Sequence, residues 1–420
     1  MRYTHAIVLC IALGTGGIIY PYTILNTNFL RPYDSIVRPR YHVGCGLQVA
    51  VYGETGLSSA QGHFYRGGTS NILQIDAQTQ DALAMLDGFP VDSAIGQKRI
   101  QVDATDDGIR GHFNLCGDLD FRFGGALSAR YSFTPHFMIS AYLPFYSARL
   151  HNVAWRDITQ SITAQDIRVR TYLTQDIFSI VRQLGCLDLC GWNRTGLGDM
   201  ALLAEWFGDY QQPNRQMLDN VRLNGRGGLI LPTGRKSDPD RLFAFAFGHD
   251  GATGILFGGG IDVLMARILQ VGVDVELLHL FGNTRERRIK VAFEQTEQLL
   301  LAKTSVYRDW GLTQRFNVYA QFYRFYRGLS LLAGYQFYKH GRDRIAFKTC
   351  AFSQEIANTS PSLHEVIIHQ VQLTASFDPW YDPCFNHKVR PYVELYARLP
   401  FRAKNAVTAP MAGIVFALDF

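Results

Sequence analysis

Hydrophobic and polar residues alternate along this chain with a period of two, in one segment after another. Residues 389–401 show the pattern clearly, with Val393 and Leu395 in one phase and Glu394 and Arg398 in the other. Successive side chains of a β-strand point to opposite faces, so such a segment has one apolar wall and one polar wall. The pattern predicts β-strands rather than helices.

About twelve segments of this kind follow one another. Lengths of roughly ten residues exceed those of most soluble strands and suit a tilted membrane crossing. The predicted strands are 41–53, 113–133, 136–150, 197–209, 217–231, 253–266, 270–282, 308–325, 329–341, 364–377, 388–401 and 408–420.

The connections between these strands alternate in length. Short connections follow the even strands, and long ones follow all odd strands except the last, whose connection is 402–407. Long loops on one side and tight turns on the other are typical of an outer-membrane barrel, whereas a soluble β-sandwich or solenoid would expose its polar face. The long loops, predicted to be extracellular, are 54–112, 151–196, 232–252, 283–307 and 342–363.

The predicted fold class is therefore all-β, a transmembrane antiparallel β-barrel of about 12 strands, within about 10–14. One segment is expected to hold a single phase through 118–133, with Leu119, Phe121 and Phe123 on the apolar side. In a barrel the apolar phase meets lipid and the polar phase lines the lumen.

Composition narrows the alternatives. The 420 residues are 47% hydrophobic and 18% charged with a mean hydropathy of -0.03, which excludes a disordered chain and a helical membrane bundle. The net charge of +5 is too small to indicate a nucleic-acid partner. The sequence predicts no cofactor, no metal centre and no catalytic residue.

The N-terminus has the pattern of a secretory signal peptide. Arg2 precedes an apolar stretch and then the small residues 14–17, so residues 1–25 are predicted to be the signal, cleaved between about Gly17 and Asn26. A buried strand or an uncleaved anchor is the alternative. Residues 26–420 are then one barrel domain in the outer membrane.

The cysteines permit disulfides in an oxidising compartment. Cys186 and Cys190, four residues apart in a predicted loop, are the best local pair, and Cys45 is expected near Cys116 if their strands pair. Unpaired thiols are the alternative.

The last strand carries a resemblance to a known superfamily. It ends on Phe420 with Leu418 and Phe416 in phase behind it, and this resembles the C-terminal signature of bacterial outer-membrane β-barrels of the porin and transporter type. A central pair of segments, 196–199 and 224–234, looks like the transporter-type barrels grouped with phenol-degradation outer-membrane proteins. The resemblance implies an outer-membrane location, recognition by the barrel-assembly machinery and, often, a passage for small solutes.

The polar phases predict which side chains line the lumen. Both signs of charge occur, which favours a channel that orients polar solutes, while a closed network of paired charges is the alternative. Tyrosines 142, 146, 319, 323, 392 and 396 are expected to narrow the lumen. The predicted lumen residues are Asp118, Asp120, Arg122, Arg130, Glu205, Arg222, Arg226, Asp262, Asp274, Glu276, Arg315, Arg390, Glu394 and Arg398.

The loops offer two further hypotheses. Loop 54–112 either folds inward as a constriction or stands outward as a surface feature, with short helices expected near 80–86 and 176–185. A basic rim would attract anionic solutes or lipopolysaccharide phosphates, unless it is simply solvated. Its members are Arg285, Arg287, Arg288, Lys290, Lys339, Arg342 and Arg344.

An enzyme is the third hypothesis. His369 lies on the apolar phase of its strand, and His249 precedes Asp250 in a loop. A Ser or an acidic group within hydrogen-bond reach of either His would favour a catalytic role.

The sequence thus favours a narrow outer-membrane channel or transporter-like pore for small polar solutes, anions among them. A non-conducting structural or adhesive surface barrel is the alternative. Expected partners are outer-membrane lipid, lipopolysaccharide and the assembly machinery. The sequence is compatible with a homo-oligomer as well as with a monomer.

Overall fold

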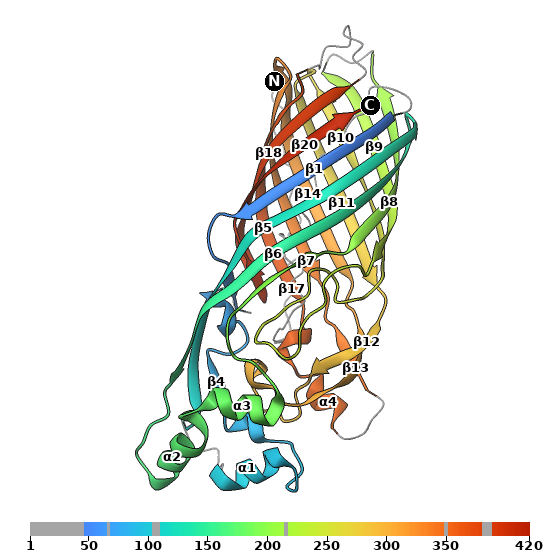
Figure 1. The fold of residues 1–420 in the computed structure, drawn as a ribbon. Helices are drawn as coiled ribbons and strands as arrows, with labels where there is room; N and C mark the ends of the chain where they lie inside the picture. The colour runs from blue at the N-terminus through green and yellow to red at the C-terminus, as the bar shows by residue number, and fades with distance from the viewer. Residues whose placement is uncertain (1–45, 65–67, 103–109, 214–216, 348–351, 380–388) are drawn as a thin grey trace, which may run out of the picture.

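The structure is a computed structural model that describes residues 46–64, 68–102, 110–213, 217–347, 352–379 and 389–420. The predicted signal peptide and Cys45 lie outside these residues. Twelve antiparallel strands form a closed barrel, which confirms the predicted fold class (Figure 1). They are β1 (Gly46–Gly56), β5 (His112–Thr134), β6 (Phe137–Asp157), β8 (Met200–Gln211), β9 (Leu218–Leu231), β10 (Gly254–Met265), β11 (Leu269–Leu280), β14 (Thr313–Tyr326), β15 (Leu329–His340), β17 (Val366–Phe377), β18 (Arg390–Lys404) and β20 (Met411–Asp419).

Closure joins the first strand to the last. β20 pairs with β1, with Phe416 opposite Val51, while the other edge of β1 pairs with β5. Every barrel strand therefore has a neighbour on both sides, as a bilayer requires, because lipid offers no partner to free backbone groups.

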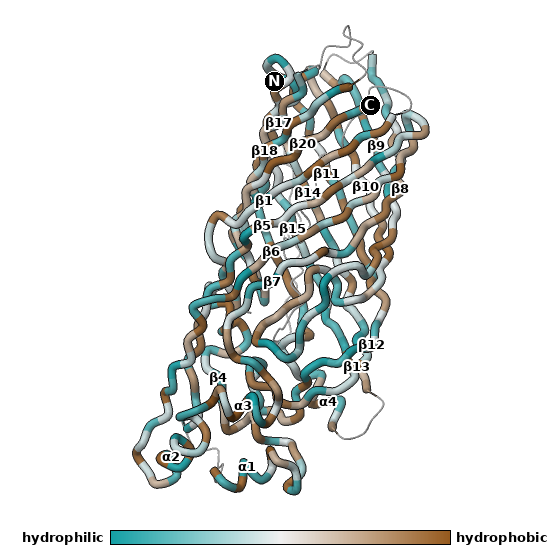
Figure 2. The backbone as a smooth tube through the Cα atoms, viewed as in Figure 1, coloured by the Kyte–Doolittle hydropathy of each residue, from teal (hydrophilic) through white to brown (hydrophobic). Residues whose placement is uncertain are grey.

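The outward side chains of the barrel are apolar. Hydrophobic and hydrophilic residues alternate along its strands (Figure 2). The exposed positions include Val51, Leu127, Phe257, Leu395 and Phe416. This belt is what a lipid-facing surface needs.

The two ends of the barrel differ. Short connections gather at one end, here called the turn end, and the other end, here called the loop end, carries the longer connections. Strands β5 and β6 have 23 and 21 residues and run beyond their neighbours at the loop end (Figure 1). Their extensions pair with two further strands, β4 (Thr79–Asp81) and β7 (Trp192–Leu197).

The remaining elements cover the loop end. Two small sheets form there, β12–β13–β16 and β19–β2–β3. Their strands are β12 (Asn283–Arg288), β13 (Lys303–Asp309), β16 (Arg344–Ala346), β2 (Gln61–His63), β3 (Thr69–Ser70) and β19 (Ala406–Thr408). The helices are α1 (Ala94–Val102), α2 (Ala164–Val169), α3 (Ile177–Gly185) and α4 (Gln354–Ala357), the 3-10 turns η2 (Ile72–Gln74), η3 (Ala84–Leu86), η5 (Glu297–Leu299) and η6 (Pro361–Leu363), and the π turn η4 (Arg170–Thr174).

Several loop predictions can be compared with these elements. The helix expected at 176–185 is confirmed as α3, whereas 80–86 holds only β4 and η3, and α1 was not predicted. The strand predicted from 308 begins at Thr313, because Lys303–Asp309 joins the loop-end sheet as β13. No helix among the described residues is long and apolar enough to cross a membrane.

The predicted disulfide is not formed. Cys186 and Cys190 are free, exposed cysteines. Cys186 is the left-handed cap of α3, and the Cys190 amide donates to Asp188 Oδ1 in the turn that leads to β7. The backbone at the two cysteines is therefore set by different local structures. Cys116, which was expected near Cys45, is also free.

Candidate functional site

The barrel wall carries a buried network of charges on strands β9, β11 and β14. Arg226 Nη1 and Nη2 donate to both Asp274 oxygens at 2.5 and 2.7 Å, and Arg226 Nη2 also reaches Glu276 Oε2 at 3.1 Å. Arg315 Nη2 donates to the same Glu276 oxygen at 2.9 Å. Two guanidinium groups thus face two carboxylates, and the network has no net charge.

The Arg226 side chain must cross a strand to make these contacts. Arg226 is on β9, its acceptors are on β11, and β10 lies between them. On β10, Gly258 lies under the guanidinium, and a Cβ built there would be 2.8 Å from Arg226 Cζ. The missing side chain lets the arginine lie flat along the wall.

Two tyrosines repeat this arrangement. Tyr319 on β14 passes over β11 to donate to Asp262 on β10, and a Cβ on Gly272 of β11 would be 2.5 Å from its hydroxyl. Tyr396 on β18 passes over β20 to donate to Glu54 on β1 at 2.8 Å. Each tyrosine therefore lies against the wall and bonds to a carboxylate two strands away.

Other lumen groups are bound locally. Arg130 Nε donates to Tyr142 Oη at 2.9 Å, and its Nη1 donates to Gln48 Oε1 at 3.0 Å. Ser140 Oγ donates to Glu205 Oε1 at 3.0 Å, and the Arg222 guanidinium lies 4.4 Å from the ring centre of Phe207. These contacts also keep the polar groups close to their strands.

Most predicted lumen residues are buried on the barrel wall. Arg390, near the turn end of β18, is only half-buried. The buried ones are Arg130, Glu205, Arg222, Arg226, Asp262, Asp274, Glu276, Arg315, Glu394 and Arg398.

The assignment of Asp118, Asp120 and Arg122 to the lumen was wrong. The pairing of β5 with β6 shifts register between Phe121 and Phe123, which is a β-bulge that reverses the phase of the strand. On the N-terminal side of the bulge Leu119 is fully buried, while Arg122, at the bulge, is exposed. The single phase expected over 118–133 therefore breaks in two.

The connection between β9 and β10, residues 232–253, folds back over the barrel mouth. Its run Leu242–Phe247 is mostly buried, and Phe247 is 0% exposed. The ring of Phe247 lies 5.8 Å from that of Tyr146, and the ring of Phe245 lies 5.4 Å from that of Trp192. We call residues 232–253 the cap loop.

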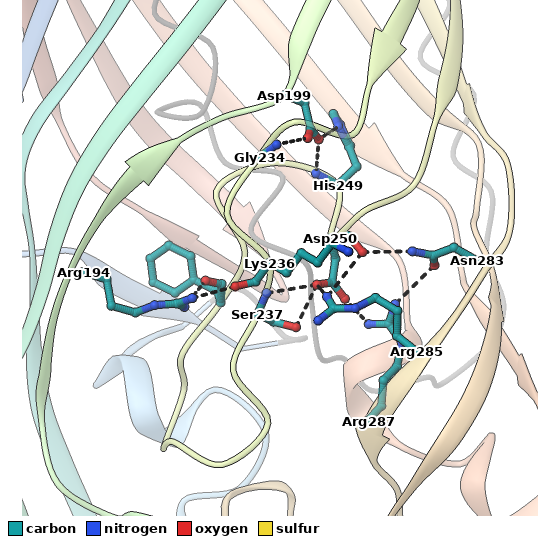
Figure 3. A network of polar contacts seen from close by, with 11 residues as sticks. Arg194, Asp199, Gly234, Lys236, Ser237, His249, Asp250, Asn283, Arg285 and Arg287 are labelled. Carbon is teal, nitrogen blue, oxygen red and sulfur yellow. Dashed lines mark hydrogen bonds and ion pairs between the residues drawn. The ribbon is translucent and has the colours of Figure 1, made fainter.

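One carboxylate ties the cap loop to the barrel. Asp199 precedes β8, and its oxygens accept from the Gly234 amide at 2.9 Å, from the His249 amide and from His249 Nδ1 at 2.9 Å (Figure 3). Asp199 thus holds both ends of the cap loop.

A second carboxylate ties the cap loop to sheet β12–β13–β16. Asp250 accepts from the Ser237 amide at 3.0 Å and from Ser237 Oγ at 2.8 Å, and it forms ion pairs with Arg285 and Arg287 of β12 (Figure 3). Burial alone would raise the pKa of Asp250, but Arg287 and Arg285 outweigh it and hold the pKa below its usual value. Asp250 is therefore ionised at neutral pH and serves as a latch.

The predicted basic rim is thus largely engaged. Arg285 and Arg287 turn toward Asp250, and Arg288 donates to the backbone carbonyls of Pro239, Leu300 and Gly185 and to Asp240. Of the remaining members, Lys339 pairs with Glu365 at 3.1 Å, and Arg342 donates to the Asn358 carbonyl at 2.8 Å.

The two histidines of the enzyme hypothesis differ. His249 does have an acidic partner, Asp199, but that carboxylate also accepts two backbone amides of the cap loop. His369 Nδ1 is 2.7 Å from Tyr335 Oη on the outer face. Among the described residues, no serine is hydrogen-bonded to either ring, so the His249–Asp199 contact has an evident role in holding the loop.

The cap loop and its two anchors were missed by the sequence reasoning. The available signal was the apolar run 242–247 inside an otherwise polar connection. Loop 54–112 was expected either to fold inward as a constriction or to stand outward, and part of it does face inward, since Ile72, Leu73 and Ile75 belong to the same apolar cluster as Phe245. Glu54 was also missed, because its strand was expected to end at residue 53.

Neither a protein-family model nor a curated protein matches the sequence. The fold is similar to that of an outer-membrane channel from Pseudomonas putida F1, with a TM-score of 0.50 and 12% identity, over 92% of this chain and 99% of that chain. Weaker likenesses are a mutant of TodX, a monoaromatic hydrocarbon channel (TM-score 0.35, 10% identity, 96% of each chain), and a Pseudomonas aeruginosa FadL homologue (TM-score 0.29, 9% identity, 96% of this chain and 98% of that chain). With the apolar outer belt, the likeness to the first of these confirms the predicted fold, a transmembrane β-barrel.

Proposed function

We propose that this barrel is a channel or transporter-like passage for small polar solutes, anions among them, and that the cap loop controls its outer mouth. The observation that carries the proposal is the way Arg226, Tyr319 and Tyr396 lie along the wall over glycines. Side chains held flat occupy less of a barrel's interior than side chains reaching across it would, which favours a passage over a filled barrel.

The cap loop supports a gated passage rather than a wide pore. Besides the apolar packing of Leu242–Phe247, two carboxylates hold it, Asp199 and Asp250. Contacts of this kind can break and re-form as a loop moves, which is how many gates work. The arginines beside Asp250 would give the outer mouth a preference for anions.

The non-conducting surface barrel has one observation of its own. Strands β5 and β6 extend beyond their neighbours toward α1, α2 and α3, so part of the molecule stands clear of the barrel (Figure 1). A projecting end of this kind would suit contact with another surface.

Single-channel conductance in a planar bilayer separates the two functions. We expect the refolded protein to give small steps with an anion preference in a salt gradient. Asp250→Asn removes the latch charge, so the steps are expected to become larger or longer-lived. Asp238→Asn is the matched control, because it makes the same change in the cap loop at an exposed ion pair with Arg241.

Folding must be verified for each variant, for example by the heat-dependent gel shift of intact barrels. Persistent silence from folded wild type and folded Asp250→Asn would overturn the passage and favour the surface protein. Equal effects of the two substitutions would remove the latch from the proposal.

A further inference from the structure

A cavity of about 150 Å³ lies at the loop end, between the cap loop and sheet β12–β13–β16. It is lined by segments that are far apart in the sequence. The polar members of its lining include Ser237, Arg287, Arg288, Arg308, Ser360 and Ser362. Each of its three arginines pairs with one carboxylate, but Asp250 serves both Arg287 and Arg285, which leaves a positive charge in excess beside the cavity.

Two of these arginines have hydrogen-bonding capacity left. Arg287 gives Nη1 to Asp250 and Nη2 to Asn283 Oδ1, but its buried Nε has no partner among the described residues. Arg308 gives Nε and Nη2 to Asp343, and within the described part of the chain no hydrogen bond uses its Nη1. An unpaired buried donor is costly, so an acceptor in the cavity would be favourable.

The pKa of Arg287 also indicates that this buried cation would gain from an acceptor in the cavity. Burial lowers the pKa of Arg287 to about 10, against the opposing effect of Asp250, and Arg308 lowers it further. Arg287 shares its counter-charge, Asp250, with Arg285, so its own charge is only partly compensated. Glu286, the acidic residue of the lining, is exposed, so water screens its charge.

We propose that this cavity binds a small oxyanion, such as a phosphate, sulfate or carboxylate group, on Arg287 and Arg308. Guanidinium groups present planar N–H donors that match such oxygens. At about 30 Å³ for each water of the liquid, the volume holds a tetrahedral oxyanion with a few waters. The inference deepens the proposed function, since it rests on a passage that admits anions and names the class captured at its mouth.

The test is titration calorimetry of the full refolded chain in detergent, with inorganic phosphate as the probe. Wild type is expected to bind saturably, and Arg287→Gln to bind about tenfold or more weakly. Arg285→Gln is the matched control, because Arg285 pairs with the same Asp250 but does not line the cavity. Its affinity is expected within about threefold of wild type.

A second variant keeps every charge. Ala357 lines the cavity and is 0% exposed, so Ala357→Leu should fill part of the space and weaken phosphate binding. Trp310, which lies 5.6 Å from the Arg287 guanidinium and 4.3 Å from that of Arg308, gives a fluorescence readout of the same event.

The outcomes are distinct. Absence of saturable binding to folded wild type, or equal binding to Arg287→Gln, would overturn the site. Competition by lipid A micelles would identify a lipid phosphate as the source of the oxyanion, and lack of competition would identify a free solute. Phosphate binding without conductance would reject the passage and keep the site, and the reverse result would reject the site alone.

Discussion

Asp343 has four donors at the loop end of the barrel. Its Oδ2 accepts from Arg308 Nε at 3.0 Å and from Arg308 Nη2 at 2.5 Å, and its Oδ1 accepts from His340 Nε2 at 2.9 Å and from the Gly311 amide at 2.6 Å. The side chain is 2% exposed. A carboxylate this well paired supports the loops around it and keeps Arg308 beside the cavity.

We expect Asp343→Asn to lower the free energy of unfolding by about 3 kcal/mol at neutral pH, because Arg308 would be left buried without its counter-charge. Burial opposes ionisation of Asp343, but Arg308 and His340 outweigh it and lower its pKa to about 2. A lowered pKa gives stability that is present above about pH 4 and lost as the pH falls toward 2. The difference between variant and wild type should therefore shrink over that range.

Urea unfolding of the barrel in vesicles, followed at several pH values, measures this. Asp238→Asn serves again as the control, since an exposed pair should change stability by less than about 0.5 kcal/mol. A constant difference between pH 7 and pH 2 would contradict the assigned role of the Asp343 charge.

At the scale of strands, the glycines of the wall set where long side chains lie. Gly272→Ala would place a methyl group 2.5 Å from Tyr319 Oη and push the tyrosine off Asp262. We expect a loss of about 1–3 kcal/mol in unfolding free energy. The current should also change, because the displaced ring would enter the lumen.

The control is Gly227→Ala on β9, whose new methyl group would meet nothing closer than 3.8 Å. It should be neutral or slightly stabilising, because alanine restricts the unfolded chain. The same urea titration reads both variants. Equal losses of unfolding free energy in the two variants would show that the close approach of Tyr319 to Gly272 does not affect stability.

Strand positions could be predicted from the sequence because alternation needs no knowledge of neighbours. The same reasoning failed at Arg122, since a bulge inserts one residue and reverses every side chain beyond it. It also failed at α1, whose sequence Ala94–Val102 has little amphipathic pattern. The alternation predicted that Arg226 points inward. It could not predict the partners of Arg226, because pairing across two strands depends on strand order and register.

The cap loop shows the same limit in a connection. The apolar run Leu242–Phe247 has no meaning in a loop until the loop is seen to turn back on the barrel. Asp199 and Asp250 are 51 residues apart in sequence order, and only the fold brings both to one loop.

For the whole molecule, closure depends on the last strand. β20 joins β18 to β1, and the Phe420 amide donates to the Leu47 carbonyl at 2.8 Å. The Phe420 side chain is 55% exposed, so it contributes little to packing. This fits the proposed role of Phe420, Leu418 and Phe416 as an assembly signal.

We therefore expect Phe420→Ala to reduce strongly the amount of barrel inserted in the outer membrane of cells, while refolding in detergent stays normal. Phe377→Ala is the control, because Phe377 ends β17 and is similarly exposed at 44%. Membrane fractionation and the heat-dependent gel shift measure both. A loss of insertion that is equal for the two variants would argue against a special role of the terminal residue.

The ion pairs of Arg226 that lie flat over Gly258 also shape the electric field inside the barrel. Opposite charges side by side act as dipoles, whose field fades with distance faster than that of single charges. A permeating ion near the axis would then feel an almost neutral wall and would slow down only where it touches one. Added salt has little long-range field to screen along such a wall, so any ion preference should arise at the mouth, where Arg285 and Arg287 stand beside Asp250.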